Sequence, residues 1–186
     1  MYKSFTFLFV LFTSIATPCK YSAQSCPAPE DVSSKTMSLF EKATDKKKKK
    51  TTEERIEILK EVVDRQNDFG AAYEALVGLL FKQAKKDREV SGECIAATAI
   101  WIELCGDQSE AHYILGALAF ISGDASSALV EFEKFIAQTD EEAENEMLSK
   151  RTVRKRRDVM EMIPEARFEV QYYSNRNAYK PEPLLY

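Results

Sequence analysis

Apolar residues recur at spacings of three and four along most of this chain, and this spacing predicts amphipathic helices. Strict alternation of apolar and polar residues is confined to a short stretch after Phe168. Seven helices are predicted: about Asp31 to Asp45, Thr52 to Arg65, Gly70 to Lys85, Gly92 to Cys105, Ser109 to Ile121, Ala125 to Gln138 and Asp140 to Ile163. The sequence therefore predicts an all-α protein.

The segment from Asp107 to Thr139 carries the clearest pattern and predicts two helices folded back on each other. Between them, Gly123 is suited to end the first helix and Asp124 to cap the second. Asp107 and Glu110 have the spacing of a capping box.

Similar boundary residues occur elsewhere. Thr51 with Glu54 and Thr139 with Glu142 fit capping boxes, Ser91 can cap a helix, and Pro164 is expected to end the last one. Within that last helix acids precede bases, as the helix dipole favours, and its few apolar residues suit a terminal capping helix.

Leu115-Gly116 followed by Ala128-x-x-x-Phe132 resembles the tetratricopeptide repeat, which has Leu-Gly in its first helix and Ala-x-x-x-Phe in its second. Two positions depart from the pattern: His112 stands where the repeat has Trp, and Asp140 where a terminal Pro is usual. The resemblance implies an α-solenoid of three antiparallel helix hairpins with a seventh helix as cap.

Small residues in the repeat allow paired helices to approach closely. The segment Ala75–Phe81 is similar to Tyr113–Phe120, with Gly78 opposite Gly116 at a separation of 38 positions, close to a 34-residue unit with an insertion. Trp101 is expected to pack as Phe132 does. The predicted repeat-packing residues are Gly78, Trp101, Leu115, Gly116, Ala128 and Phe132.

The repeat family implies a concave groove lined by the first helix of each hairpin, in which a peptide or partner protein binds. By this resemblance, the predicted groove residues are Glu110, Tyr113, Ala117 and Phe120 in one helix, and Ala72, Ala75, Leu79 and Lys82 in another. The expected role is that of a protein-interaction scaffold.

The first residues have the layout of a secretory signal peptide. Lys3 precedes an apolar run from Phe5 to Ala16, and cleavage is expected after Ala23. The predicted organisation is a signal peptide at 1–23, a lead-in at 24–30, the helical domain at 31–163 and a Pro- and aromatic-rich tail at 164–186. Removal of 1–23 takes the formal net charge from −4 to −6, because two lysines and no acid are lost. A transmembrane span is not expected in the mature chain, and nucleic acid is not an expected partner.

Three of the four cysteines remain after the predicted cleavage: Cys26, Cys94 and Cys105. Cys94 and Cys105 lie roughly 16 Å apart along one predicted helix and cannot bridge each other. Cys26 could pair with either, although buried structural thiols are the preferred interpretation. Lipidation of Cys26 is a further alternative, because it follows the small residue Ser25.

Catalytic and cofactor chemistry has little support in the sequence. His112 is the single histidine, and no Walker loop, G-x-S-x-G or H-E-x-x-H motif is present. A non-enzymatic protein with no cofactor or metal is therefore predicted.

Two basic runs leave a second hypothesis open. Lys46–Lys50 is five consecutive lysines, and Lys150–Arg157 holds six bases in eight residues. These runs could bind an anionic membrane surface or cell-wall polymer.

The export signal, the repeats and the Pro- and aromatic-rich tail together resemble the amino-terminal region of PorE-like Bacteroidetes cell-envelope proteins. In those proteins a β-propeller and an OmpA-like peptidoglycan-binding domain follow. This resemblance implies a periplasmic location, associated with the outer membrane and with other cell-envelope components.

Overall fold

The computed structural model describes residues 26, 31–45, 47, 49–145 and 147–178. The predicted signal peptide, Lys46, Lys48 and the end of the tail lie outside the described residues. The helices are α1 (Ser34–Thr44), α2 (Thr52–Arg65), α3 (Gly70–Ala84), a 3-10 turn η1 (Arg88–Val90), α4 (Ser91–Cys105), α5 (Ser109–Ser122), α6 (Ala125–Asn145) and α7 (Lys150–Ala178). The described chain contains no strand, so the all-α prediction is confirmed.

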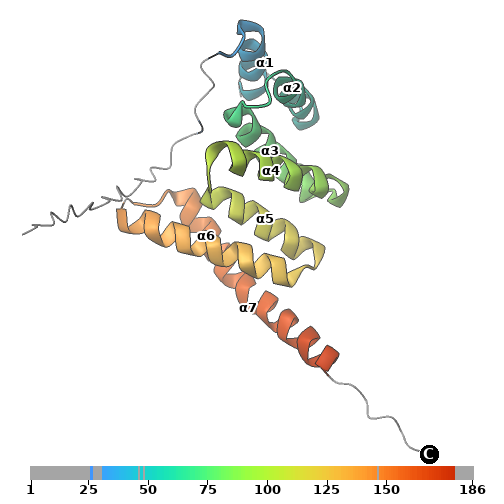
Figure 1. Ribbon diagram of the computed structural model, residues 1–186, viewed down its shortest axis with the longest axis vertical. Helices are drawn as coiled ribbons and strands as arrows, with labels where there is room; N and C mark the ends of the chain where they lie inside the picture. Colours follow the sequence, from blue (N-terminus) through green and yellow to red (C-terminus); the bar gives the residue numbers. More distant parts are fainter. Residues whose placement is uncertain (1–25, 27–30, 46, 48, 146, 179–186) are drawn as a thin grey trace, which may run out of the picture.

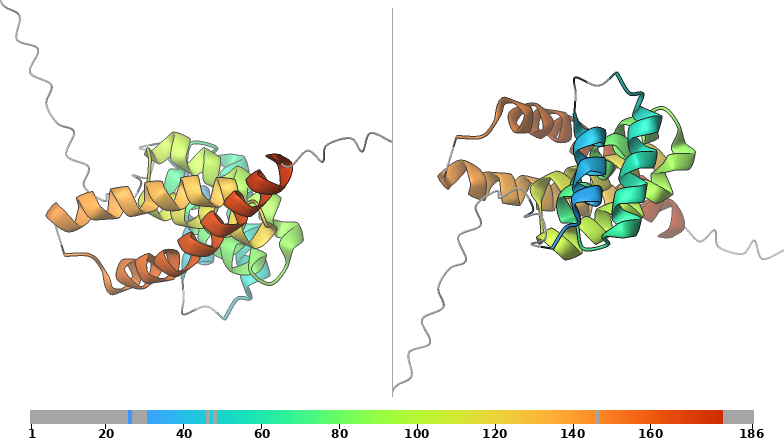
Figure 2. Two further views of the ribbon diagram at one scale, coloured as in Figure 1. Left: turned by 90° about the horizontal axis from the view of Figure 1, so that it is seen from below. Right: turned by 90° about the horizontal axis from the view of Figure 1, so that it is seen from above.

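The helices are stacked in chain order, with α1 and α2 at one end and α6 and α7 at the other (Figure 1). Each helix packs against the next one, and α7 also reaches α5. Seen along the stack, α7 crosses α6 at an angle (Figure 2). The core is a continuous row of apolar side chains; its largest fully buried members are Phe69, Phe132, Phe135, Leu59, Leu80, Ile114 and Leu118.

Most predicted boundaries lie within a few residues of the observed ones, because their local signals are strong. The Thr51 hydroxyl accepts from the Glu54 N–H while the Glu54 carboxylate accepts from the Thr51 N–H, so the predicted capping box is confirmed. Gly123 ends α5 with φ of 86°, a left-handed conformation that favours glycine. Asp124 caps α6 by accepting from the Ser127 N–H.

Two other caps are wrong. Ser91 is the first residue of α4 and not its cap, because η1 leads directly into the helix. Asp107 and Glu110 do not form a capping box at the start of α5, whose cap residue is Gln108. The carboxylate of Asp107 is engaged by His112, and that of Glu110 by α7.

The predicted boundary at Thr139 is also wrong, because α6 runs on to Asn145. Thr139 is fully buried, and its hydroxyl donates to the carbonyl oxygen of Phe135, one turn back in the same helix. The acids after Thr139 therefore end α6 and the bases begin α7, which is the arrangement that helix dipoles disfavour. A tertiary ion pair offsets this cost, since Arg156 Nη2 lies 2.5 Å from Asp140 Oδ1.

Pro164 does not end the last helix. It lies inside α7, which continues through the segment where alternation suggested a strand. Proline removes one backbone donor from a helix, but α7 has buried anchors on both sides of it, in Val159 and Ala166, both fully buried. Burial of one face therefore outweighs the local signal.

The predicted close approach of helices is observed at one glycine and not at the other. A Cβ atom at Gly116 would overlap the ring of Phe132, so α5 and α6 touch there. A Cβ atom at Gly78 would meet nothing within 4 Å. In the α3–α4 pair, Cys94 Sγ lies 3.9 Å from the carbonyl oxygen of Val77.

The spacing of apolar residues in α4 predicts a buried face of Ile95, Ala96, Ala99, Ile100 and Leu104, but all five are exposed. The buried residues are Cys94, Ala97, Thr98 and Trp101. Because α4 is apolar nearly all round, its sequence could not specify which face turns inward.

Cys26 and Cys105 form a disulfide, with their Cα atoms 5.3 Å apart. The preferred interpretation of buried thiols is therefore wrong for this pair, and it holds for Cys94, which is free and fully buried. The sulfur of Cys26 is bonded to Cys105, which excludes lipidation of that sulfur in this structure. The bridge closes 79 positions of sequence, and a loop of that length is stabilised by about 4 kcal/mol.

We expect the two helix-interior glycines to respond in opposite ways to the same substitution. Gly116→Ala should lower the free energy of unfolding by about 1–3 kcal/mol, because the new methyl group overlaps Phe132. Gly78→Ala, the matched control, should raise it by up to about 1 kcal/mol, because alanine favours helices and open space surrounds the site. Urea unfolding of both variants measures this, and equal losses would contradict the packing at Gly116.

We also expect Cys94 to be inert in the folded protein. Burial raises the pKa of its thiol to about 11, so the nucleophilic thiolate is scarce at pH 8. With Cys19 replaced by Ser, a thiol reagent should detect no thiol in the folded chain, one after unfolding and three after unfolding with reduction. Cys94→Ala should remove the thiol that unfolding exposes. A thiol that reacts in the folded, oxidised chain would contradict the structure.

Candidate partner-binding surface

The predicted groove residues of α5 lie beside α7. Glu110 accepts from Lys155 Nζ through one carboxylate oxygen, and its other oxygen lies 3.1 Å from Arg151 Nη2. The last helix thus places two bases on one acid of α5. Because Lys155 is only 8% exposed, this ion pair is largely shielded from water.

Tyr113 is 7% exposed and forms an aromatic contact between helices rather than an open groove wall. Its ring centroid lies 5.9 Å from that of Phe81 in α3 and 5.6 Å from that of Phe135 in α6. Lys155 Nζ lies 4.7 Å from the same centroid, in a cation–π arrangement. Ala117 is also buried, and Phe120 is half-buried against Phe132.

Charges here sit in a partly dry environment. Burial lowers the pKa of Lys155 to about 8, and the nearby ammonium of Lys85 acts in the same direction. Burial raises the pKa of the Tyr113 hydroxyl, and desolvation raises that of Glu74 while Arg151 opposes it. Arg151 therefore lies near both Glu74 of α3 and Glu110 of α5.

The predicted groove residues of α3 are mostly turned away from solvent. Ala72 and Leu79 lie in the core, Ala75 is half-buried, and Lys82 is exposed. The matching positions of α5, Tyr113 and Ala117, are buried as well. In both helices these positions therefore pack against neighbouring helices and do not line an open groove.

A more exposed side of α3 is formed by Ala71, Glu74, Gly78 and Lys82, at spacings of three and four. Glu74 and Lys82 are exposed, and Ala71 and Gly78 are half-buried. Together with Glu110 and Arg151, these residues form what we call the α3–α5–α7 surface. It combines acids, bases and a glycine that leaves the backbone open to approach.

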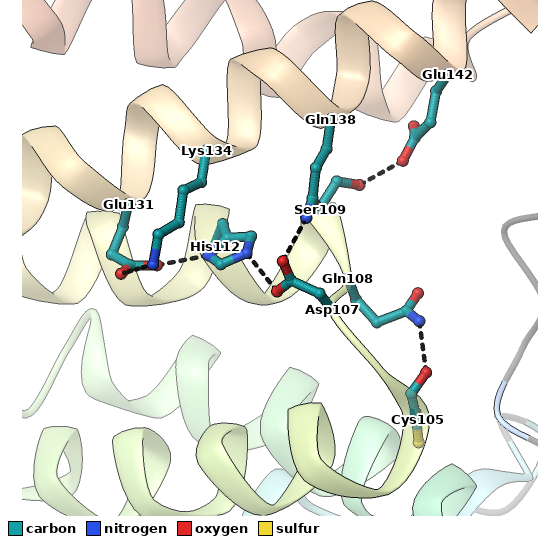
Figure 3. Close-up of polar contacts among 9 residues, drawn as sticks. All are labelled: Cys105, Asp107, Gln108, Ser109, His112, Glu131, Lys134, Gln138 and Glu142. Carbon is teal, nitrogen blue, oxygen red and sulfur yellow. Dashed lines mark hydrogen bonds and ion pairs between the residues drawn. The ribbon is translucent and has the colours of Figure 1, made fainter. Parts of the chain in front are cut away.

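For His112 the sequence left a groove-facing or a structural role open, without naming its partners. The residue is 3% exposed and links α5 to its surroundings (Figure 3). Its Nδ1 atom lies 2.5 Å from Glu131 Oε2 in α6, and its Nε2 atom 2.6 Å from Asp107 Oδ1. The imidazolium form can donate to both carboxylates, whereas the neutral ring can donate to one. Gln138 Nε2 donates to the other oxygen of Asp107, at 2.8 Å, so the network links Glu131 and Gln138 of α6 to His112 of α5 and to Asp107 just before it.

Three of the six bases in Lys150–Arg157 form ion pairs with acids of the same chain. Arg151 and Lys155 contact Glu110, and Arg156 contacts Asp140. Lys150, Arg154 and Arg157 remain exposed. In the other basic run, Lys47 and Lys49 are exposed and Lys50 is half-buried.

The described residues contain no group of three or more His, Cys, Asp or Glu side chains placed to hold a metal ion. Among the helices searched, which are those of the described chain, none is long and apolar enough to cross a membrane.

Comparison with known proteins found no relative of this chain. No family model matches this chain, and neither a curated protein nor a solved structure matches it. Assignment to a class therefore depends on the chain's own residues and contacts.

We expect His112→Leu to destabilise the fold by about 3 kcal/mol, because it leaves Glu131 and Asp107 without their shared donor. Lys134→Ala is the matched control: it removes a 3.0 Å ion pair to the other oxygen of Glu131, but Lys134 is half-exposed, and the cost should be under about 0.5 kcal/mol. Thermal and urea unfolding compare the two variants. Equal stability of His112→Leu and the parent would show that the contacts of His112 with Glu131 and Asp107 do not stabilise the fold.

Proposed function

We propose that this chain is an exported tetratricopeptide-like protein that binds a partner protein or peptide in the bacterial cell envelope. In this proposal α1/α2, α3/α4 and α5/α6 are three antiparallel hairpins of an α-solenoid, and α7 is its terminal helix. The role is non-enzymatic and needs no cofactor.

The repeat assignment is supported by the contacts of α5 and α6. Gly116 receives the ring of Phe132, Ala128 is fully buried between the helices, and His112 takes the structural place of the repeat's Trp by binding carboxylates of the same hairpin. Sequential packing, in which each helix contacts the next, also supports a solenoid.

The observation that carries the binding proposal is the exposed side of α3. Gly78 lies in mid-helix with open space where a side chain would stand, although glycine costs a helix about 1 kcal/mol relative to alanine. Glu74 and Lys82 flank it, one turn away on either side. A peptide backbone could approach Gly78 closely while these charges fix its direction.

Export is supported by the Cys26–Cys105 disulfide, because such bonds persist in oxidising compartments such as the periplasm. The apolar run from Phe5 to Ala16 supports the same location. The alternative function, binding of an anionic surface, gains less: three of the six bases in Lys150–Arg157 are already paired with acids of the chain.

Site-specific photo-crosslinking tests the binding surface in living cells. A photoreactive amino acid at Ala71, on the same side of α3, leaves Gly78 open and should give a discrete crosslinked partner, whereas the same group at Ala99, on the exposed side of α4, should not. Glu74→Lys with Lys82→Glu should reduce the Ala71 product at least tenfold, about 1.4 kcal/mol, without unfolding the chain.

The anionic-surface alternative predicts a different result. It requires binding to anionic vesicles that is lost at high salt, with unchanged crosslinking in the Glu74→Lys, Lys82→Glu variant. Equal crosslinking from positions 71 and 99 would also contradict the proposed surface.

A further inference from the structure

The outer face of α7 carries a regular row of exposed side chains that the proposed function does not use. Val159 and Ala166 face inward and are fully buried. On the opposite side, at spacings of four and three, lies a row that we call the α7 stripe: Lys150, Arg154, Arg157, Glu165, Phe168 and Tyr172, with Glu161 at its centre. Phe168 is 69% and Tyr172 52% exposed, which is unusual for aromatic side chains.

Ion pairing separates the two sides of α7. The bases that face the body each have an acid partner: Arg151 and Lys155 contact Glu110, Arg156 contacts Asp140, and Arg167 contacts Glu133. Within the described part of the chain, none of the charged residues of the stripe forms an ion pair. The stripe therefore presents charges that the monomer does not neutralise.

The order of residues in the stripe is symmetric about Glu161. Arg157 and Glu165 each lie four residues from it, Arg154 and Phe168 seven, and Lys150 and Tyr172 eleven. Each basic residue before the centre thus corresponds to an acid or an aromatic ring after it.

We propose that the α7 stripe binds the α7 stripe of a second copy of this chain, antiparallel, with a two-fold axis at Glu161. This arrangement places Arg157 against Glu165 of the other copy, and Arg154 and Lys150 against its Phe168 and Tyr172. Ion pairs and cation–π contacts then occur twice, as a two-fold interface requires.

The acids of the stripe favour a second copy over a membrane, because Glu161 and Glu165 would face the phosphates of an anionic bilayer and be repelled. Met160, which is 61% exposed, and Pro164 lie beside the centre of the stripe. In the dimer they would meet near the two-fold axis and add apolar contact. The repulsion between the two Glu161 side chains is offset by Arg157 one turn away on each copy.

The row spans about 33 Å, and one helix of each copy supplies the contacts. We therefore expect a dimer with a micromolar Kd that weakens as salt increases.

Charge reversal within the stripe provides the test, using the full exported chain in sedimentation equilibrium. Arg157→Glu and Glu165→Arg should each raise the dimer Kd at least tenfold, since each opposes like charges twice. The double variant should restore dimerisation. An equimolar mixture of the two single variants should form a heterodimer, because every 157–165 pair then joins opposite charges.

The matched control is Glu103→Arg, an exposed reversal on α4 that should leave the Kd unchanged. Circular dichroism of each variant checks that it is folded. In addition, Glu161→Cys should give a covalent dimer on mild oxidation, and Glu103→Cys should not. A parent chain that stays monomeric at high micromolar concentration, a double variant that is not restored, or vesicle binding that requires Arg157 would overturn the proposal.

Discussion

The contact between Gly116 and Phe132 determines how the two central helices meet. Because the ring lies where a Cβ atom would stand, α5 and α6 approach closely enough for side chains at their ends to interact. His112 can then reach Glu131 of α6, and Ser109 reaches Glu142 of the same helix. With α6 fixed in this way, its acids and Glu110 of α5 present the charges on which α7 packs.

Local signals in the sequence predicted most of the helices because they depend on few residues. The capping box at Thr51 and the left-handed glycine at Gly123 act within one turn, and both are observed. The predicted ends at Thr139 and Pro164 failed for the opposite reason. Burial of Thr139 and of one face of α7 comes from residues distant in sequence, which no local pattern contains.

The candidate surface was predicted less well than the fold, because the resemblance supplied groove positions without the packing that covers them. Tyr113 of α5 lies against the rings of Phe81 and Phe135, and Lys155 of α7 lies over its ring. Ala72 and Leu79 lie in the core, while Lys82 is exposed. Which side of α3 and α5 stays open depends on contacts between helices, which the spacing along a single helix does not contain.

The charges of α7 illustrate why a basic run cannot be interpreted from composition alone. In the sequence, Lys150–Arg157 is a single block with six bases in eight residues. In the helix, the block divides by angle: Arg151, Lys155 and Arg156 meet acids of α5 and α6, and the others face outward. The ion pairs of the inward bases therefore hold α7 in place, although bases at the start of a helix interact unfavourably with the helix dipole. The outward charges form no ion pair within the described part of the chain, which leaves them available for the contact with a second copy proposed above.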